Sequence, residues 1–322
     1  MKVVQSLLLI IAIVLAALIG AHFLEKGLQT RKEAARIADL KARVAEVTNP
    51  FPFTTYNAKA VCMIDATSGQ TIYQSNGDQA LPLASMTKVM TAYLALKSFA
   101  RTDTIFVDPT TKSFTPEDKA LLGHTWSFDA LLSALLINSS NTAADALAAT
   151  YAKLQRGDFV TDMNRTSQVL GLGTLSYKNP SGIDLVYDTH REGGGMGSAC
   201  DSARMLVELQ KKYPGYALLS AKMENTIQAL DGTALILHNT DPLPGEKSGI
   251  LASKTGSTTL AGGNLSLVYS AGGEIFGIVV IGAQDETARL EEMRKLLSNT
   301  DAFMDELEKH EVKLAEYLQW RM

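Results

Sequence analysis

The chain has few cysteines, few histidines and no concentration of basic side chains. Its 322 residues include only two cysteines, Cys62 and Cys200, which lie far apart and form no C-x-x-C pair. A disulfide-rich scaffold is therefore excluded. We expect two buried thiols rather than a disulfide bond. Export from the cytoplasm would permit a bridge, but the geometry that a bridge needs is not written in the sequence.

The five histidines are scattered, and none has the H-x-x-x-H or H-x-H spacing of a zinc site. This argues against a metal-dependent peptidase, and we expect neither a metal nor another cofactor. The formal net charge is −4, and no Lys/Arg cluster is interleaved with aromatic residues. A nucleic acid is therefore not expected as a partner.

One long apolar run lies at the N-terminus. It is unbroken from Leu7 to Ala21 and extends to Leu24 if His22 is tolerated. Lys2 precedes it, which favours a cytoplasmic N-terminus. A cleaved signal peptide usually has a shorter apolar core and an Ala-x-Ala-like site, which is absent near this run. We expect residues 1–24 to be a membrane anchor, with a cleaved signal sequence and a secreted domain as the alternative.

The next segment, residues 25–52, predicts a helical stalk and linker. It is dense in Lys, Arg, Glu and Ala, and its apolar positions are too sparse for a wide buried face. Asn49-Pro50-Phe51-Pro52 then ends the helix and marks a domain boundary. We expect one large domain over residues 53–300, held on the outer face of the membrane.

Within that domain, strand patterns come first, helical patterns fill the middle, and strands and a helix close it. The expected strands are Ala60–Ala66, Thr71–Gln74, Ile250–Ser257, Asn264–Ser270 and Ile275–Ala283. The expected helices are Ser85–Leu96, Phe128–Ile137, Thr142–Leu154, Phe159–Leu170, Asp201–Lys211 and Glu286–Leu297. This order predicts an α/β fold of the α+β type, an antiparallel sheet flanked by helices with an inserted helical subdomain.

The C-terminal tail, residues 301–322, places several apolar residues on one helical face. A helix lying on a membrane surface is one interpretation, but six acidic residues would oppose an anionic bilayer. We therefore expect the tail to continue the packed terminal helix.

Three short strings carry the chemistry, and each of their patterns occurs once. They are Ser85-Met86-Thr87-Lys88, Ser139-Ser140-Asn141 and Lys254-Thr255-Gly256. On a helix, residues three apart are neighbours, so the Lys88 amine can reach the Ser85 hydroxyl. A serine needs a base to take its proton, and lysine serves when burial or another cation keeps it neutral. Taken alone, the first string better fits a capping serine and a solvated lysine, because about one such match is expected by chance.

The other two strings supply the remaining groups. The Ser139 hydroxyl can pass a proton to a leaving amine, and the Asn141 amide can hold a substrate carbonyl. Alone, both are ordinary capping and turn residues. Strand alternation places Lys254 and Gly256 on one face, where the ammonium can bind a carboxylate and a substrate backbone can lie close. Together, in this order and on these elements, the three strings are poorly explained by coincidence.

The combination resembles the penicillin-binding D-alanyl-D-alanine carboxypeptidases of the low-molecular-mass class. The resemblance runs from about Ala60 to Leu297. Besides the three strings, it rests on Asp65-Ala66-Thr67-Ser68-Gly69, Met163-Asn164, Asn179-Pro180-Ser181-Gly182 and Ala261-Gly262. It implies a β-lactamase/transpeptidase-like fold, peptidoglycan stem peptides as substrate and β-lactam antibiotics as inhibitors.

The resemblance also implies a role for each matching position. Ser85 would be the acylated nucleophile, Lys88 its base and Ser139 the proton relay. Backbone N–H groups of Ser85 and Ser257 would form the oxyanion hole. The positions implied for substrate binding are Asn141, Lys254, Thr255, Gly256 and Ser257.

Departures from the family pattern leave alternatives open. Many members carry Gly where this chain has Ser140, and many carry a further β-rich domain for which the residues after 300 are too few. A class A β-lactamase needs a glutamate to activate water, and none occurs between Asn141 and Glu192. We therefore expect a carboxypeptidase that is inhibited by β-lactams. A β-lactamase, a D,D-endopeptidase and a catalytically silent penicillin-binding or wall-binding module are the alternatives.

Overall fold

The computed structural model describes residues 2–112, 115–154 and 156–321, and it divides into two compact units. One unit contains the chain up to Asn49 together with the segment from Asp305 onward; the other is residues 50–304. The three segments that carry the strings all lie in the second unit.

The first unit is built on one long helix, α1 (Lys2–Glu46), which covers both the expected anchor and the expected stalk. By length and composition, its apolar part can cross a membrane, and none of that part is buried. Near its end, Arg43 donates to the carbonyl oxygen of Glu311 at 2.8 Å, and Lys41 lies over the Trp320 ring at 4.3 Å. The tail helix α11 (Leu314–Trp320) thus packs against the C-terminal turns of α1.

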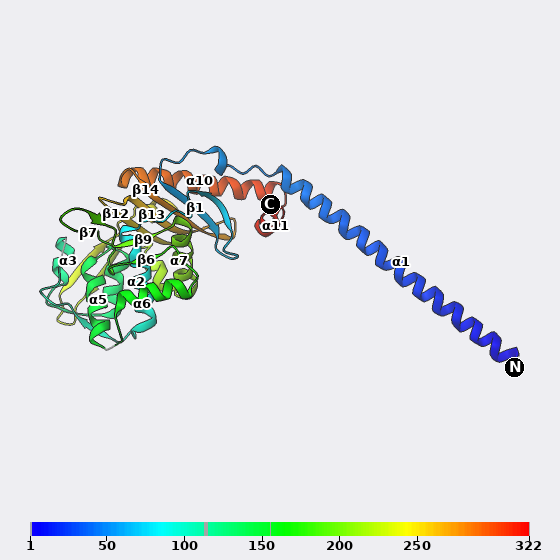
Figure 1. The fold of residues 1–322 in the computed structure, drawn as a ribbon, viewed down its shortest axis with the longest axis horizontal. Helices are drawn as coiled ribbons and strands as arrows, with labels where there is room; N and C mark the ends of the chain where they lie inside the picture. Colours follow the sequence, from blue (N-terminus) through cyan, green and yellow to red (C-terminus); the bar gives the residue numbers. More distant parts are fainter. Residues whose placement is uncertain (1, 113–114, 155, 322) are drawn as a thin grey trace. The chain divides into compact units, whose positions relative to one another are not determined.

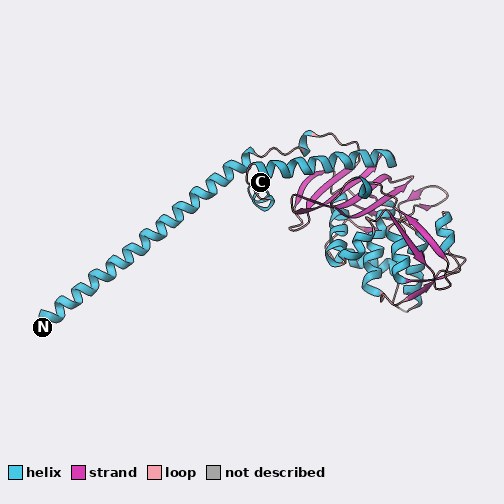
Figure 2. Ribbon diagram, turned by 180° about the vertical axis from the view of Figure 1, so that it is seen from behind, coloured by secondary structure: helices cyan, strands magenta, loops and turns pink. Residues whose placement is uncertain are grey.

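The second unit is built on a five-stranded antiparallel sheet of order β12-β13-β14-β1-β2. The first and last strands of the unit are therefore neighbours. The antiparallel sheet itself agrees with the fold expected from the sequence. Figure 1 shows this sheet between α10 and α7, and Figure 2 shows the strands gathered beside the helical region. The strands are β1 (Ala60–Asp65), β2 (Thr71–Ser75), β12 (Ile250–Thr258), β13 (Gly262–Ala271) and β14 (Glu274–Ala283).

Alternation along β1 assigns the two faces of the sheet. Met63 faces α10 (Glu286–Lys309), where its sulfur lies 3.7 Å from the Thr300 hydroxyl. Ile64 faces the other way, toward α7 (Ala199–Lys212), where Val207 packs in the space that a side chain at Gly277 would fill. Both faces are thus covered, which is why the strand is buried throughout.

The helical subdomain is inserted between β2 and β12. Three of its helices, α4, α5 and α6, begin at side-chain caps: Ser127, Ser140 and Asp158 each accept a hydrogen bond from a backbone N–H of the first turn. Ser198 caps α7 in the same way. The helices of this part are α2 (Lys88–Ser98), α3 (Pro116–Leu121), α4 (Phe128–Leu136), α5 (Asn141–Lys153), α6 (Phe159–Val169), α8 (Pro214–Leu219) and α9 (Leu243–Glu246).

Several short strands and 3-10 turns were not expected from the sequence. They are too brief for a two-residue period to stand out. They comprise β3 (Leu81–Pro82), β4 (Thr104–Phe106), β5 (Thr125–Ser127), β6 (Ser176–Tyr177), β7 (Leu185–Val186), β8 (Arg191–Glu192), β9 (Gly195–Gly197), β10 (Glu224–Gln228), β11 (Ala234–His238), η1 (Phe51–Phe53) and η2 (Ala84–Thr87).

The expectation of two free thiols is wrong. Cys62 of β1 and Cys200 of α7 form a disulfide bond that joins the sheet to the helix covering it. Both residues are buried, as expected, but packing α7 against β1 brings their sulfurs together. The contact spans 138 residues of sequence, so no local pattern could reveal it.

Candidate active site

The three strings meet in the second unit, each on a different kind of element. Ser85 lies on the 3-10 turn η2, and the α-helix proper begins at Lys88. Ser85 is therefore not the N-cap of an α-helix, contrary to the expected helix start, but a single turn still places the two side chains together. The preceding residue, Ala84, has a φ of 50°, a strained conformation for a residue with a side chain.

Lys88 is the centre of a hydrogen-bond cluster. Its Nζ donates to Ser85 Oγ at 2.8 Å, to Asn141 Oδ1 at 2.7 Å and to the carbonyl oxygen of Ser181 at 2.7 Å. The side chain is fully buried, and burial lowers its pKa from 10.5 to about 7, against the opposing charges of Asp118 and Asp145. A lysine with such a pKa is neutral in a large fraction of molecules near neutral pH and can take a proton from serine.

A second lysine, Lys254, joins the third string to the second. Lys254 Nζ donates to Ser139 Oγ at 2.8 Å and to the carbonyl oxygen of Thr255 at 3.0 Å. Burial lowers the pKa of Lys254 well below 10.5, and the positive charges of Lys88 and Arg289 add to this effect. An incoming carboxylate would favour the charged form again, which suits a group that binds a peptide C-terminus. Ser139 itself has a φ of 57°.

The strand β12 carries the third string along the edge of the sheet and against η2. A side chain at Gly256 would meet the carbonyl oxygen of Leu83 at 2.7 Å, so only glycine allows this approach. Thr255 shares a hydrogen bond of 2.6 Å with Thr240 through their hydroxyls, and Ser257 is exposed. The site residues expected from the sequence therefore lie around one small region.

Some residues that support this region were not singled out from the sequence. The Asn264 amide donates to the carbonyl oxygens of Pro82 and Leu83 at 3.0 and 3.1 Å and so ties the segment that leads into η2 to β13. Thr258 donates to Asp184 at 2.9 Å, which links the end of β12 to the loop after Ser181. Asn264 and Thr258 both lie close to a motif in the sequence. Their hydrogen-bond partners are many residues away, so the sequence alone does not reveal these contacts.

A buried carboxylate lies behind the second string. Ser140 Oγ donates to Asp118 Oδ1 and accepts a hydrogen bond from the N–H of Ala143 at 3.0 Å. Asp118, on α3, is 1% exposed and also lies 3.4 Å from the N–H of Thr142. Asp118 was not singled out from the sequence, because the element that carries it contains no recognisable motif.

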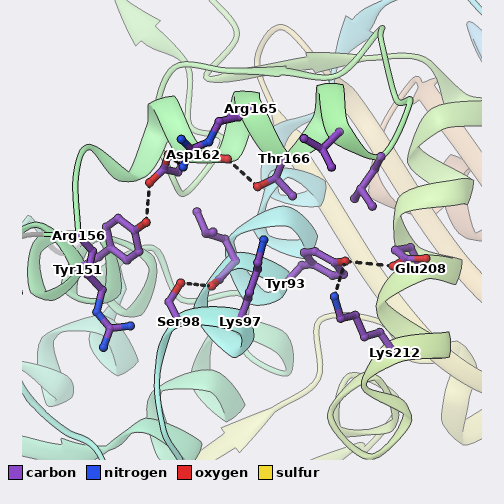
Figure 3. A pocket seen from close by; sticks show the side chains of 13 residues that line it. Tyr93, Lys97, Ser98, Tyr151, Arg156, Asp162, Arg165, Thr166, Glu208 and Lys212 are labelled. Atoms are coloured by element: carbon purple, nitrogen blue, oxygen red, sulfur yellow. Dashed lines mark hydrogen bonds and ion pairs between the residues drawn. The ribbon is translucent and has the colours of Figure 1, made fainter.

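Two further observations concern what else the unit holds. Among the described residues, no group of three or more His, Cys, Asp or Glu side chains is placed to hold a metal ion. A cavity of about 730 Å³ opens between α2, α5, α6 and α7, lined by Tyr93, Lys97, Tyr151, Arg165 and Lys212 among others (Figure 3). None of the expected site residues lines it.

Comparison with known proteins gives consistent matches. The family model described as D-alanyl-D-alanine carboxypeptidase matches residues 44–285. The D-alanyl-D-alanine carboxypeptidase DacF of Bacillus subtilis is 29% identical over 75% of this chain and 61% of its own length. A D-alanyl-D-alanine endopeptidase of Pseudomonas aeruginosa is 30% identical over 68% of this chain and 69% of its own length. The chain thus spans about three-fifths of the first of these relatives.

A solved structure shows the same fold. The penicillin-binding protein of Listeria monocytogenes in its ampicillin-bound form is 25% identical, with a TM-score of 0.65 over 76% of this chain and 97% of that one. The predicted transpeptidase-like fold is confirmed. Because the family model covers about three-quarters of the sequence and includes all three strings, the chain belongs to the D-alanyl-D-alanine carboxypeptidase family.

Proposed function

We propose that this protein is a serine-type D-alanyl-D-alanine carboxypeptidase that removes the terminal D-alanine from peptidoglycan stem peptides. One observation carries the proposal: a fully buried Lys88 with a pKa of about 7 lies 2.8 Å from Ser85 Oγ. A base poised near neutral pH beside a hydroxyl is what nucleophilic catalysis by serine requires.

In the first step, neutral Lys88 takes the Ser85 proton while Oγ attacks the carbonyl carbon between the two D-alanines. The oxygen that becomes negative lies between the backbone N–H groups of Ser85 and Ser257. The C–N bond then breaks, and Ser139 gives a proton to the leaving nitrogen. Lys254, hydrogen-bonded to Ser139 at 2.8 Å, gives Ser139 a replacement proton. Lys254 then regains the proton that Lys88 took from Ser85, so the net transfer is one proton from Ser85 to the leaving nitrogen.

The substrate would be held at both ends of the reacting bond. The Asn141 amide binds a backbone carbonyl, and Lys254 with the Thr255 hydroxyl binds the terminal carboxylate. In the second step, water attacks the acyl-enzyme, and Lys88 takes its proton. The products are D-alanine, the shortened peptide and free Ser85.

A β-lactam would acylate Ser85 in the same way and leave slowly. The first glutamate after Asn141 is Glu192, a partly exposed residue paired with Lys178. Among the described residues its hydrogen-bond and ion-pair partners are Lys178 and His190 rather than Ser85 or Lys88, so rapid hydrolysis by the class A β-lactamase route is not favoured. The similarity to a named endopeptidase makes cleavage of cross-linked peptides the second candidate activity.

The location and division of the chain are also proposals. The exposed apolar part of α1 supports a membrane anchor over residues 1–24, followed by a stalk over residues 25–52. Residues 53–300 would be the catalytic domain on the extracytoplasmic face, and residues 301–322 a helical tail.

Release of D-alanine tests the proposed reaction directly. The protein is incubated with a pentapeptide ending in D-Ala-D-Ala and, separately, with a cross-linked peptide dimer, and products are identified by mass. Free D-alanine from the pentapeptide, absent with Ser85→Ala, supports the carboxypeptidase. Cleavage of the dimer alone would assign the endopeptidase activity instead, and no product from either would contradict both.

A further inference from the structure

The turn that carries the second string is held by a buried carboxylate, that of Asp118. Ser140, its middle residue, uses one hydroxyl for two bonds: it donates to Asp118 and accepts from the N–H of Ala143. Ser140 and Asp118 are 3% and 1% exposed, so water does not compete for these bonds. A buried carboxylate bonded to a serine fixes the position of that serine.

Both neighbours of Ser140 contact a lysine of the site. Ser139 Oγ accepts from Lys254 at 2.8 Å, and Asn141 Oδ1 accepts from Lys88 at 2.7 Å. Ser139 holds a left-handed φ of 57°, which persists only where surrounding contacts enforce it. The bond between Ser140 and Asp118 lies at the centre of that turn.

We propose that Asp118 is a positioning residue for acylation: through Ser140 it holds the turn that presents Ser139 and Asn141 to the two lysines. The proposal rests on the proposed acyl-transfer function. Asp118 forms no hydrogen bond with Ser85 or Lys88 among the described residues, so it acts through Ser140, through its weaker contact with the N–H of Thr142 and through its charge.

The charge gives Asp118 a second effect that a purely structural residue would lack. The charged groups that face Lys88 are Asp118 from α3, Asp145 from α5 and Lys254 from β12. The negative charge of Asp118 raises the pKa of Lys88, but the opposite effect of burial is larger. Burial raises the pKa of the Asp145 carboxyl to about 6. Removing the Asp118 charge should therefore make Lys88 easier to deprotonate.

Helix α5, which begins at Asn141, offers a matched control near its C-terminal end. Near the C-terminus of α5, the Tyr151 hydroxyl donates to the buried carboxylate of Asp162 at 2.5 Å (Figure 3). Like Asp118, Asp162 is a buried carboxylate that accepts from a hydroxyl of α5 or its cap. Asp162 belongs to α6 and lines the separate cavity, and its partner Tyr151 lies near the opposite end of α5 from Asn141.

The test compares Asp118→Asn, Ser140→Ala, their double variant and Asp162→Asn in the full chain. The acylation rate with a fluorescent penicillin is measured from about pH 5 to pH 9, and a thermal melt reports folding. We expect Asp118→Asn to lower the plateau rate about 10- to 100-fold, because small displacements of catalytic groups have effects of that size. The acid limb of this variant, which is the part of the pH profile where the acylation rate rises with pH, should also move to lower pH.

Ser140→Ala should lower the plateau to a similar extent without moving the acid limb to lower pH. The double variant should be little slower than the slower single variant, because the two residues act as one unit. Asp162→Asn should leave both plateau and limb unchanged even if it lowers the melting temperature. If Asp118→Asn does not fold, the test rests on position 140. Ser140→Ala must then slow acylation, and Ser140→Thr, which keeps the hydroxyl, must acylate at close to the wild-type rate.

Equal acylation by wild type and folded Asp118→Asn would overturn the inference alone. The inference would also be overturned if the rate losses of the two single variants multiplied in the double variant. The same holds if Asp162→Asn lowered the acylation rate as much as Asp118→Asn. A wild-type protein that forms no adduct would contradict the proposed function itself and this inference with it.

Discussion

At the scale of single residues, the site depends on two lysines that are almost fully buried. Lys88 and Lys254 are 0% and 2% exposed, and the hydrogen bonds of both described ammonium groups go to hydroxyl, amide or carbonyl oxygens rather than to carboxylates. Burial without a paired carboxylate disfavours the charged form, which is why the pKa of each is lowered. In the proposed mechanism, the same burial that costs stability supplies the base for acylation.

The pH dependence of acylation follows from Lys88. Because its pKa is lowered to about 7 and the neutral amine is the base, the acylation rate should rise with pH through about 7 and then level. Lys88→Arg should abolish acylation across this range, since guanidinium keeps its proton. Stopped-flow labelling with a penicillin measures the profile. A flat profile between about pH 5 and pH 9 would contradict Lys88 as the base.

Gly256 should tolerate no side chain. In Gly256→Ala the new Cβ meets the Leu83 carbonyl at 2.7 Å, so η2 or β12 must shift. We expect a loss of about 1–3 kcal/mol in unfolding free energy and slower acylation. Gly173→Ala is the control, because a Cβ there meets nothing within 4 Å. Equal stability of the two variants in urea denaturation would disprove the close approach.

At the scale of elements, a 3-10 turn, an interhelical turn and an edge strand meet at the site. The order of strands and helices was predictable, because long amphipathic and apolar segments carry their period in the local sequence. Ser85, Lys88 and the third string could be found because their chemistry requires fixed spacing. Asp118 and the Cys62–Cys200 bond could not, because each depends on packing between elements that are distant in sequence.

The disulfide bond between β1 and α7 should contribute to stability but not to chemistry. Closing a loop of 138 residues is expected to stabilise the protein by roughly 5 kcal/mol, and replacing both cysteines with serine should remove most of this. Guanidinium unfolding with and without reductant measures the change, with the double variant insensitive to reductant. Two titratable thiols in unreduced, denatured wild type would show that the bond does not form.

At the scale of the whole molecule, one chain combines a long N-terminal helix with a catalytic unit. The apolar part of α1 is exposed throughout, which in water would be an aggregation hazard and in a bilayer is the expected state. The first part of the tail prolongs α10 to Lys309, as expected, whereas α11 forms a separate helix that packs on the last turns of α1.

Removing residues 2–24 should release the protein from membranes without changing its acylation rate. The full chain should sediment with membranes and resist carbonate washing, whereas the shortened chain should be soluble. Cell fractionation followed by penicillin labelling of each fraction measures both properties. A full-length gene product recovered as a soluble form that begins shortly after residue 21 would instead indicate a cleaved signal sequence.

The central claim is that Ser85 is an acylated nucleophile with Lys88 as its base. The most direct measurement is the intact mass of the protein after incubation with a β-lactam, followed by peptide mapping. We predict a lasting increase equal to one β-lactam, located on Ser85 and absent in Ser85→Ala. An adduct that persists in Ser85→Ala, or no adduct in the wild-type protein, would contradict it.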